Sequence, residues 1–412
     1  MKFIFIHPNF PAQFRHLAEF LGKDPKNRVI FITANPRPEW KIPGVHKIIY
    51  KEAPIPEILN ASPLTNFAKV NSKGEAVGRT LLKLRKKNFI PDVICGHCGW
   101  GSSLYIKDVF PETPFLGYFE WYYHDRNVNL ASNEKRPPDI DTRIRARNRS
   151  LSILNDLVAC DHGFCPTKWQ KSQFPKEFHH KLSVIHDGIN PKFFAPTPDL
   201  KLKLPGLDLS QVKELVTYTS RGLEPYRGFP QFIESIPLIL EKRPAAHIVI
   251  VGEDRVCYGR KLPHGQTYKT LITEKIKLEP DRVHFVNSLP YGQYLQVLQA
   301  SSVHVYLTVP FVLSWSLLEA MSCECLLVAS DTPPVREVIQ NGVNGVLTDL
   351  FSPEKIAEKV VACLEYPSFM KTVKKNARKT ILERYSLEKM LSRQLHVIKQ
   401  LTEAANRKNL FG

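Results

Sequence analysis

Apolar residues occur along the chain in short, uninterrupted runs, which are separated by stretches with a helical period. The runs are rich in Val, Ile and Leu and do not alternate with polar residues, as is typical of strands buried on both faces of a sheet. We predict strands at 2–7, 28–33, 46–50, 92–96, 114–119 and 182–186, and then at 215–219, 247–252, 282–287, 303–308, 325–330 and 345–349.

The stretches between these runs predict helices. In 229–240, for example, Phe229, Phe232 and Ile236 follow the 3.6-residue period. Residues 353–407 contain no strand pattern and predict successive helices, with Ser386 as the N-cap of the last one.

This alternation of strands and helices predicts the domain organisation. It is typical of parallel sheets covered by helices on both faces, and twelve strands are too many for one open sheet. We therefore predict an α/β protein of two doubly wound domains, at 1–190 and 213–385, joined by a Pro- and Lys-rich linker at 191–212. Because ligands bind at the carboxyl ends of such strands, a ligand held by both domains would lie in the cleft between them.

Composition excludes several classes of protein. Of the 412 residues, 43% are hydrophobic and 24% charged, which excludes a disordered chain or a coiled coil. No apolar run reaches the roughly 18 residues of a membrane span, and the start, MKFIFIHPNF, reads as a strand rather than a signal peptide. Eight cysteines do not make a disulfide scaffold, so we expect a reduced, cytoplasmic setting.

The chain is strongly basic. Lys and Arg number 57 against 40 Asp and Glu, a net charge of +17. Such an excess favours an anionic partner: nucleic acid, an anionic membrane surface or a phosphorylated substrate.

Two arginines flank a glycine-containing turn after a predicted strand. In 215–229, Arg221 leaves the strand and Arg227 enters the next helix, with Gly222 and Gly228 between and after them. A helix N-terminus favours an anion, and the planar fork of arginine suits phosphate. The pair predicts a phosphate site; two surface arginines in a turn are the alternative.

A carboxylate stands among apolar residues in the segment SWSLLEAM. Burying Glu319 unpaired would be costly, so we expect it to face a ligand hydroxyl or a cation. Ser314, Trp315 and Ser316 occupy the first turn of this helix, where their N–H groups could bind a second anion. Exposure of Glu319 on the outer face of the helix is the alternative.

From VIHDGIN through RGLEPYRGF and SWSLLEAM, residues 180–400 resemble the C-terminal domain of family-four retaining glycosyltransferases. The resemblance implies the GT-B architecture, two Rossmann-like domains facing a central cleft, with a last helix, 386–412, that crosses back to the first domain. It also implies transfer of a sugar, with retention, from a UDP- or GDP-sugar, and no requirement for a metal such as Mg²⁺ or for another cofactor. Arg221 and Arg227 match the basic pair on the donor diphosphate, and Glu319 matches the second Glu of the Glu-x7-Glu motif, on the ribose.

The sequence departs from the family pattern at two places. Arg227 stands where the family has Lys, and Phe311 replaces the first Glu of the motif, which in the family contacts the transferred sugar. Ser314 and Trp315 also replace small residues. The chain therefore looks like a divergent branch, and its donor sugar is not predicted.

In the N-terminal half, polar residues follow three predicted strands. We predict His97 and Glu120 as catalytic residues, because each follows a strand and related enzymes carry a His at the position of Glu120. Asn9, Gln13 and His124 are candidate cleft or acceptor contacts. The alternatives are a hydrogen-bonded structural His97, a Glu120 paired with an arginine, and ordinary loop polar residues.

Two patterns that could suggest a metal have simpler explanations. Asp139-Ile-Asp141 precedes a predicted helix, so we expect a capping residue there rather than a metal ligand. Cys95-x2-Cys98 and Cys160-x4-Cys165 match no common zinc spacing and predict buried cysteines.

Basic runs at 81–87, 143–149 and 371–379 bear on the acceptor. They would suit a lipid-linked or phosphorylated acceptor at the inner face of an anionic membrane, or they are solvated helix faces. A glycan acceptor is equally open. The rival functions are a sugar-nucleotide epimerase on the same fold and a basic nucleic-acid-binding or modifying protein, which the dispersed basic runs do not favour.

Overall fold

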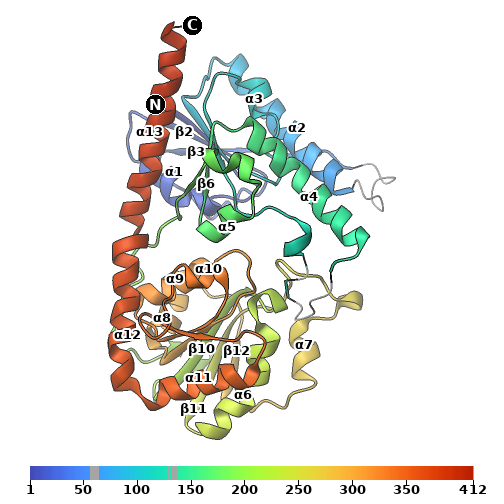
Figure 1. The fold of residues 1–412 in the computed structure, drawn as a ribbon. Coiled ribbons are helices and arrows are strands. Elements are labelled where there is room, and N and C mark those ends of the chain that lie inside the picture. Colours follow the sequence, from blue (N-terminus) through green and yellow to red (C-terminus); the bar gives the residue numbers. More distant parts are fainter. Residues whose placement is uncertain (56–64, 129, 132–136, 412) are drawn as a thin grey trace. The chain divides into compact units, whose positions relative to one another are not determined.

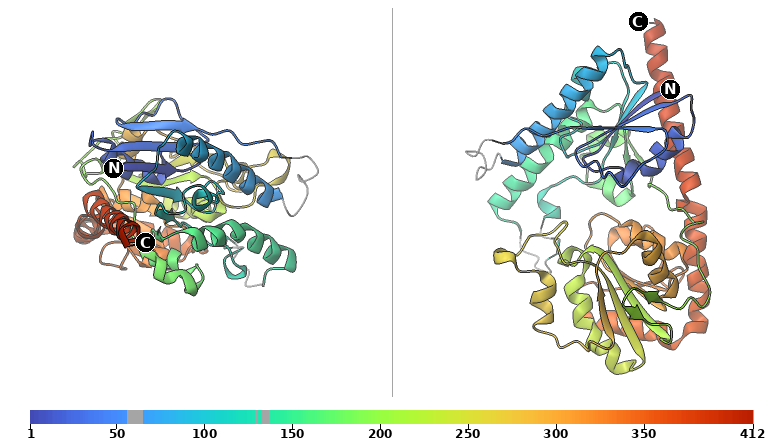
Figure 2. Two further views of the ribbon diagram at one scale, coloured as in Figure 1. Left: turned by 90° about the horizontal axis from the view of Figure 1, so that it is seen from above. Right: turned by 180° about the vertical axis from the view of Figure 1, so that it is seen from behind.

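The computed structural model describes residues 1–55, 65–128, 130–131 and 137–411, and the chain forms two compact units. The first unit contains Met1–Val128, Arg136–Gly188 and Glu388–Gly412, and the second contains Ile189–Leu387. Helices cover both faces of a parallel sheet in each unit (Figures 1 and 2). The predicted α/β class with two Rossmann-like domains is confirmed.

The first unit is built on a seven-stranded parallel sheet in the order β3-β2-β1-β4-β5-β6-β7. Its strands are β1 (Lys2–Ile6), β2 (Arg28–Thr33), β3 (Val45–Ile49), β4 (Val93–His97), β5 (Phe115–Tyr118), β6 (His162–Cys165) and β7 (Leu182–Val184). Six of them coincide with predicted strands. The sequence analysis missed β6, because the residues HGFC contain no Val, Ile or Leu.

Helices on the two faces of this sheet bury two apolar clusters. One face packs against α1 (Arg15–Gly22) and α13 (Leu387–Phe411), whose Met390 and Ile398 join Phe3 and Phe5 of β1. The other face packs against α2 (Thr65–Lys86), α3 (Ile106–Val109) and α4 (Ile140–Ala159). A short helix, α5 (Lys168–Ser172), follows β6.

The second unit has a six-stranded parallel sheet in the order β12-β11-β10-β13-β14-β15. Its strands are β10 (Glu214–Gly222), β11 (Ala246–Glu253), β12 (Val283–Val286), β13 (Val303–Tyr306), β14 (Leu327–Ser330) and β15 (Val346–Thr348). Its helices are α6 (Phe229–Lys242), α7 (Tyr268–Thr273), α8 (Tyr291–Ala300), α9 (Trp315–Ser322), α10 (Pro333–Arg336), α11 (Pro353–Glu365) and α12 (Pro367–Thr380). The strand and helix predictions for this half are confirmed within a few residues.

The segment predicted as a linker is folded. It carries a small antiparallel pair, β8 (Lys203–Leu204) and β9 (Leu207–Asp208). Leu202, Leu204 and Leu209 are buried in one cluster with Val249 of β11. Leucines alternate with polar residues here, so the hairpin buries one side and becomes part of the second unit.

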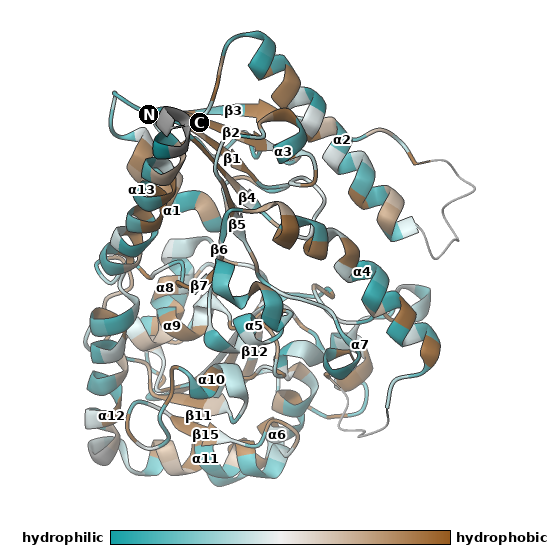
Figure 3. Cartoon of the chain, turned by 45° about the horizontal axis from the view of Figure 1, so that its top comes forward, coloured by the Kyte–Doolittle hydropathy of each residue, from teal (hydrophilic) through white to brown (hydrophobic). Residues whose placement is uncertain are grey.

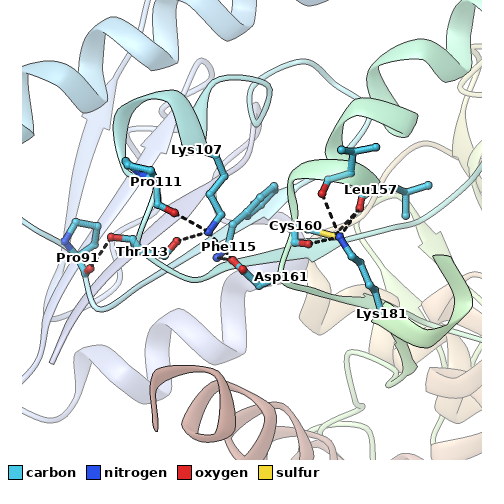
Figure 4. Close-up of polar contacts among 10 residues, drawn as sticks. Pro91, Lys107, Pro111, Thr113, Phe115, Leu157, Cys160, Asp161 and Lys181 are labelled. Atoms are coloured by element: carbon cyan, nitrogen blue, oxygen red, sulfur yellow. Dashed lines mark hydrogen bonds and ion pairs between the residues drawn. The ribbon is translucent and has the colours of Figure 1, made fainter. Parts of the chain in front are cut away.

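Two lysines hold the first unit together at the start of β5 and the end of α4 (Figure 4). Lys107 donates to the carbonyls of Pro111 and Thr113 and lies 2.7 Å from Asp161, whose carboxylate accepts from the N–H of Phe115. Lys181 donates to the carbonyls of Leu157, Val158 and Cys160 at distances of 2.8–3.1 Å. A cation at a helix C-terminus satisfies carbonyls that have no partner within the helix.

Candidate functional site

In the second unit, the candidate site begins at the turn between β10 and α6. Pro225–Arg227 forms a 3₁₀ turn, Gly228 follows with a φ of 61°, and α6 begins at Phe229. A Cβ on residue 228 would stand 2.6 Å from the Cβ of Leu307, so only glycine fits this approach. Arg227 therefore lies just before α6, and its side chain points into the interior of the second unit.

The guanidinium of Arg227 is buried among neutral partners. The side chain is 6% exposed, and its Nη1 donates to Thr308 Oγ1 at 2.8 Å and to the Val312 carbonyl at 3.1 Å. Its guanidinium carbon lies 5.1 Å from the centre of the Tyr258 ring. Burial opposes the charge, yet Tyr306 and Tyr258 beside it hold the pKa of Arg227 above its ordinary value.

Arg221 occupies a different environment from Arg227. It lies inside β10, and its side chain is exposed. Among the residues that the structure describes, Arg227 has no carboxylate within ion-pair distance and Arg221 has no hydrogen-bond partner. The reading of both as surface arginines is therefore wrong for Arg227.

Sequence analysis missed Glu224, which positions the loop that covers Arg227. The side chain is fully buried, and its carboxylate accepts from the backbone N–H groups of Cys257, Tyr258 and Gly259 at 2.7–3.2 Å. A carboxylate that receives three backbone N–H groups fixes a loop firmly. The signal in the sequence was Glu224 itself, an acidic residue between the two arginines.

Phe311, which takes the place of the first motif glutamate, packs into an aromatic cluster. Its ring centre lies 5.3 Å from that of Tyr226 and 5.4 Å from that of Tyr258, both nearly edge-on. The side chain is 8% exposed. Because Tyr258 also lies over Arg227, the aromatic cluster and the buried cation share one wall.

Glu319 is buried in α9, so the alternative of an exposed Glu319 is wrong. The side chain is 5% exposed, and its Oε2 accepts from the hydroxyl of Tyr294 at 2.9 Å. Burial raises the pKa of Glu319 to about 7, although the hydrogen bond from Tyr294 opposes the rise. The carboxyl group is thus poised to change its charge near neutral pH.

The first turn of α9 uses two of its N–H groups internally. Ser314 donates its N–H to the Tyr306 hydroxyl at 2.9 Å, and the N–H of Ser316 donates to Ser314 Oγ at 3.3 Å. Ser314 is thus the N-cap of α9, with Trp315 next to it in the first turn. An anion at this turn would compete with these bonds, which the sequence analysis did not anticipate.

In the first unit, the candidate site lies where β4 and β5 end. His97 is 2% exposed, and its Nδ1 lies 3.2 Å from the carbonyl of Cys98. A carbonyl accepts only, so this contact assigns the proton to Nδ1 and leaves Nε2 as an acceptor. Nε2 has no hydrogen-bond partner among the described residues and lies 3.8 Å from Glu120 Oε2.

Glu120 and Gln13, both predicted for this site, are in contact. Gln13 Nε2 donates to Glu120 Oε1 at 3.3 Å, and Gln170 Nε2 donates to the backbone carbonyl of Glu120 at 2.8 Å. Burial lowers the pKa of His97 to about 4, so the imidazole is neutral at pH 7. Two acceptors, His97 Nε2 and Glu120 Oε2, thus face each other.

Further polar groups that the sequence analysis missed lie at the ends of these strands. The His7 ring, directly after β1, stands 4.7 Å from the His97 ring in a perpendicular arrangement. The buried Tyr118 donates its hydroxyl to Asp187 Oδ2 at 3.0 Å. All of them follow or end a strand, so the rule that sites lie at carboxyl ends of strands could have found them.

Asn9 and His124, the other predicted contacts, have local roles. Asn9 is exposed, and its backbone N–H donates to His7 Nδ1 at 2.8 Å. His124 accepts from the N–H of Arg126 and its Nε2 lies 3.1 Å from Gln173 Oε1, so it caps a 3₁₀ turn. The structure does not bring His124 into hydrogen-bond contact with His97 or Glu120.

A buried carboxylate fixes the loop that carries His97. Asp156 of α4 is fully buried and accepts from the N–H of Gly99 at 2.9 Å. Burial raises its pKa to about 7.

The candidate metal patterns resolve into structural roles. Asp139 is the N-cap of α4 and accepts from the N–H of Thr142 at 2.6 Å, which confirms the capping prediction. Cys95, Cys98, Cys160 and Cys165 are buried free thiols. Within the described residues, no three His, Cys, Asp or Glu side chains are grouped so as to hold a metal ion.

Two family models match successive parts of the chain. Residues 25–194 match the glycosyl transferase family 4 group, and residues 208–380 match the glycosyl transferases group 1. Both models describe glycosyl transferases, and together the two matched ranges cover most of the chain.

An uncharacterized glycosyltransferase of Methanocaldococcus jannaschii is 26% identical over 231 residues, which are 55% of this chain and 56% of the relative. The matched part thus spans about half the length of that relative. A second uncharacterized glycosyltransferase of this organism is 27% identical over 29% of this chain and 31% of its own.

Solved structures show the same fold. Sucrose-phosphate synthase from Thermosynechococcus elongatus has a TM-score of 0.73 at 18% identity, covering 98% of this chain and all of its own. HepE from Anabaena, in complex with UDP and glucose, has a TM-score of 0.72 at 15% identity, covering 97% of this chain and all of its own. The chain has the GT-B fold.

Proposed function

We propose that this protein is a retaining glycosyltransferase that binds a UDP- or GDP-sugar in its second unit and transfers the sugar to an acceptor. The observation that carries the proposal is Arg227, a buried cation held by a hydroxyl and a carbonyl rather than by a carboxylate. Burying a charge without a counter-charge is costly, so this arrangement favours an anionic ligand. Complexes of the HepE fold relative with UDP and with UDP-glucose support a uridine donor.

The chemistry of the transfer explains why the cations are needed. As the bond between the sugar and the diphosphate breaks, negative charge grows on the leaving phosphate. A fixed guanidinium stabilises this charge where it develops without having to reorganise. In this proposal Arg227 supplies the preorganised charge, and the exposed Arg221 adds a second, adaptable one.

Glu319 has the properties of a group that binds the ribose. When ionised, its carboxylate can accept from ribose hydroxyls while Tyr294 holds one of its oxygens. Because the pKa of Glu319 is raised to about 7, binding through this contact strengthens as the pH rises through neutrality.

In the first unit, His97 and Glu120 would act on hydroxyl groups. The neutral His97 offers an acceptor at Nε2, and Glu120 Oε2 lies 3.8 Å away. A sugar or acceptor hydroxyl can donate to either, and the carboxylate can take up the proton as the hydroxyl attacks. With no metal in the proposal, Mg²⁺ would not be needed; the acceptor class, whether glycan, lipid-linked or phosphorylated, stays open.

Calorimetric titration of the full chain with UDP, GDP, ADP, dTDP and CDP tests the proposal, first with EDTA and then with Mg²⁺. We expect one nucleotide to bind without metal, and Arg221→Ala to weaken it about tenfold by removing one charge-assisted contact. Lys242→Ala is the matched control, because it removes one exposed cation from the far end of α6 and should leave the affinity unchanged.

The same preparation, given the sugar derivative of that nucleotide and candidate acceptors, should yield a product whose anomeric configuration, read by NMR, equals that of the donor. Absence of nucleotide binding would refute the donor site. An inverted product would refute retention alone.

A further inference from the structure

The outer face of α4 is apolar, although the helix already buries its inner face. Ala146, Ile153 and Leu157 point into the first unit and are buried. On the opposite side, five large aliphatic residues are exposed, by 37–65% of their surface: Ile140, Ile144, Leu151, Leu154 and Val158. A helix that packs on one side ordinarily has a polar outer face, so this second face lacks an occupant.

The exposed residues form one stripe along the helix. Their spacing of 4, 7, 3 and 4 residues places all five within one narrow sector of an α-helix. From Ile140 to Val158 the stripe is about 27 Å long at 1.5 Å per residue. Figure 3 shows hydrophobic and hydrophilic residues interleaved along α4.

Arginines accompany the stripe. Arg147 lies within it and Arg143 at its edge, whereas Arg145 and Arg149 project from other sides of the helix, about 140° and 180° from the middle of the stripe. On α4 itself the exposed acidic side chain is Asp141, since Asp156 is buried. Arg143 lies 3.7 Å from Asp125, and Arg149 lies over the ring of Tyr123.

We propose that the outer face of α4 docks on an anionic lipid surface. A cationic helix with an exposed apolar stripe lies in the headgroup region, with aliphatic side chains inserted and arginines on the phosphates. Among the described residues, no helix is long and apolar enough to cross a membrane.

Other occupants fit the stripe less well. A nucleic acid would satisfy the arginines but would give the five aliphatic side chains no apolar contact. A second copy of the chain would cover the aliphatic residues but would bury Arg147 without a carboxylate from α4 to pair with it, which is costly. A lipid surface satisfies both halves of the pattern.

Co-sedimentation of the full chain with vesicles tests this proposal, without nucleotide so that its outcome is independent of the proposed activity. We expect binding to phosphatidylcholine vesicles that contain phosphatidylglycerol, and little binding to phosphatidylcholine alone. Arg143→Gln/Arg147→Gln should weaken binding about five-fold for each charge removed. Ile144→Ser/Leu151→Ser should weaken vesicle binding about tenfold or more for the two substitutions together. Because the lost interaction is hydrophobic, a change in salt concentration should not reverse this loss.

Matched control variants test whether α4, rather than another part of the surface, binds the vesicles. Lys371→Gln/Lys375→Gln removes two exposed charges at the same spacing from α12, and Phe20→Ser removes an exposed aromatic side chain from α1. Both should bind vesicles like the unmodified protein. Because all the substituted positions are exposed, thermal unfolding should stay unchanged, which checks that each variant is folded.

Three results would overturn the proposal. One is an absence of vesicle binding, and another is equal loss in the control variants. The third is a dimer, seen by analytical ultracentrifugation, that Ile144→Ser/Leu151→Ser abolishes, since the stripe would then be an interface between two copies.

Discussion

The two candidate sites of this protein differ in the charge of the side chains that they bury. The second unit buries a permanent cation, Arg227, among neutral partners, and it separately buries in α9 a carboxyl group, Glu319, whose pKa is raised. The first unit buries an imidazole, His97, whose pKa is lowered, so it is neutral and faces the carboxylate of Glu120. In the proposed function, the buried cation of one site would bind an anion, and the hydrogen-bond acceptors of the other would bind hydroxyl groups.

In the proposed reaction, this difference would give each unit its own contribution. A leaving diphosphate needs fixed positive charge, whereas an attacking hydroxyl needs an acceptor for its proton. The Rossmann-like sheets are alike in kind, so the side chains at the ends of their strands, and not the fold, distinguish the two roles.

The largest effect on nucleotide binding should come from removing the buried positive charge of Arg227. In Arg227→Met, the side chain keeps much of its volume and loses its cation. We expect nucleotide affinity to fall about 100-fold or more, because a buried arginine–phosphate contact is lost. The same variant should be at least as stable as the parent without ligand, because the cost of burying an unpaired cation disappears.

Calorimetry and thermal unfolding of the same samples check both halves of this prediction. If Arg227→Met binds nucleotide as the parent does, Arg227 is structural. If Arg227→Met lowers both the stability of the protein and its affinity for the nucleotide, the guanidinium stabilises the second unit through Thr308 and Val312 and is not held in place for a ligand.

A smaller effect is expected on how the free energy of unfolding depends on pH. The sign of this dependence should be opposite for His97 in the first unit and Glu319 in the second. The pKa of His97 is lowered to about 4, so its contribution to the free energy of unfolding is complete above pH 6.5 and is lost as the pH falls towards 4. The pKa of Glu319 is raised to about 7, so its contribution is present below pH 4.5 and is lost as the pH rises towards 7. Each amounts to about 3 kcal/mol over its range.

Urea unfolding between pH 4 and 8 measures how the free energy of unfolding changes with pH in each variant. The difference between the parent and His97→Gln should shrink towards low pH, and the difference between the parent and Glu319→Gln should shrink towards high pH. Equal slopes for the two variants would contradict the contrast between the sites.

The smallest effect on nucleotide binding should come from Phe311→Glu, which introduces the carboxylate that the family motif carries. Phe311 contacts Tyr226 and Tyr258 rather than Arg227 directly, so we expect the affinity for the free nucleotide to change by less than about three-fold, below the worth of one hydrogen bond. The ranking of nucleotide sugars by transfer rate should change, because a hydroxyl-binding group replaces an apolar one. Phe311→Leu is the control, and a ranking unchanged in Phe311→Glu would show that the position does not contact the sugar.

Much of the fold could be predicted because it is written in local patterns. Buried parallel strands need apolar runs, and twelve of the thirteen strands in the two large sheets have them. Strand β6 escaped prediction because Gly163 replaces a bulky side chain. A Cβ there would lie 2.6 Å from the ring of Phe119, which directly follows β5, so this aromatic side chain fills the space.

The candidate site could be predicted only in part. The apolar neighbours of Glu319 indicated that its carboxylate is buried, and the strand ends indicated His97 and Glu120. The contact between His124 and Gln173 could not be predicted, because Gln173 lies far along the chain, and a role of His124 as an acceptor contact stays a prediction. Glu224 was missed because the three N–H groups that it holds belong to residues 257–259.

The sequence by itself determined twelve of the thirteen strands of the two parallel sheets and where these strands end, because periodicity and turn residues act over a few neighbours. Only the tertiary structure decided which of two arginines, six residues apart, is buried. Arg221 stays exposed, whereas Arg227 turns towards Thr308 and Val312, about eighty residues further along, and beneath Tyr258. Burial and charge state depend on such distant partners, and no local pattern contains them.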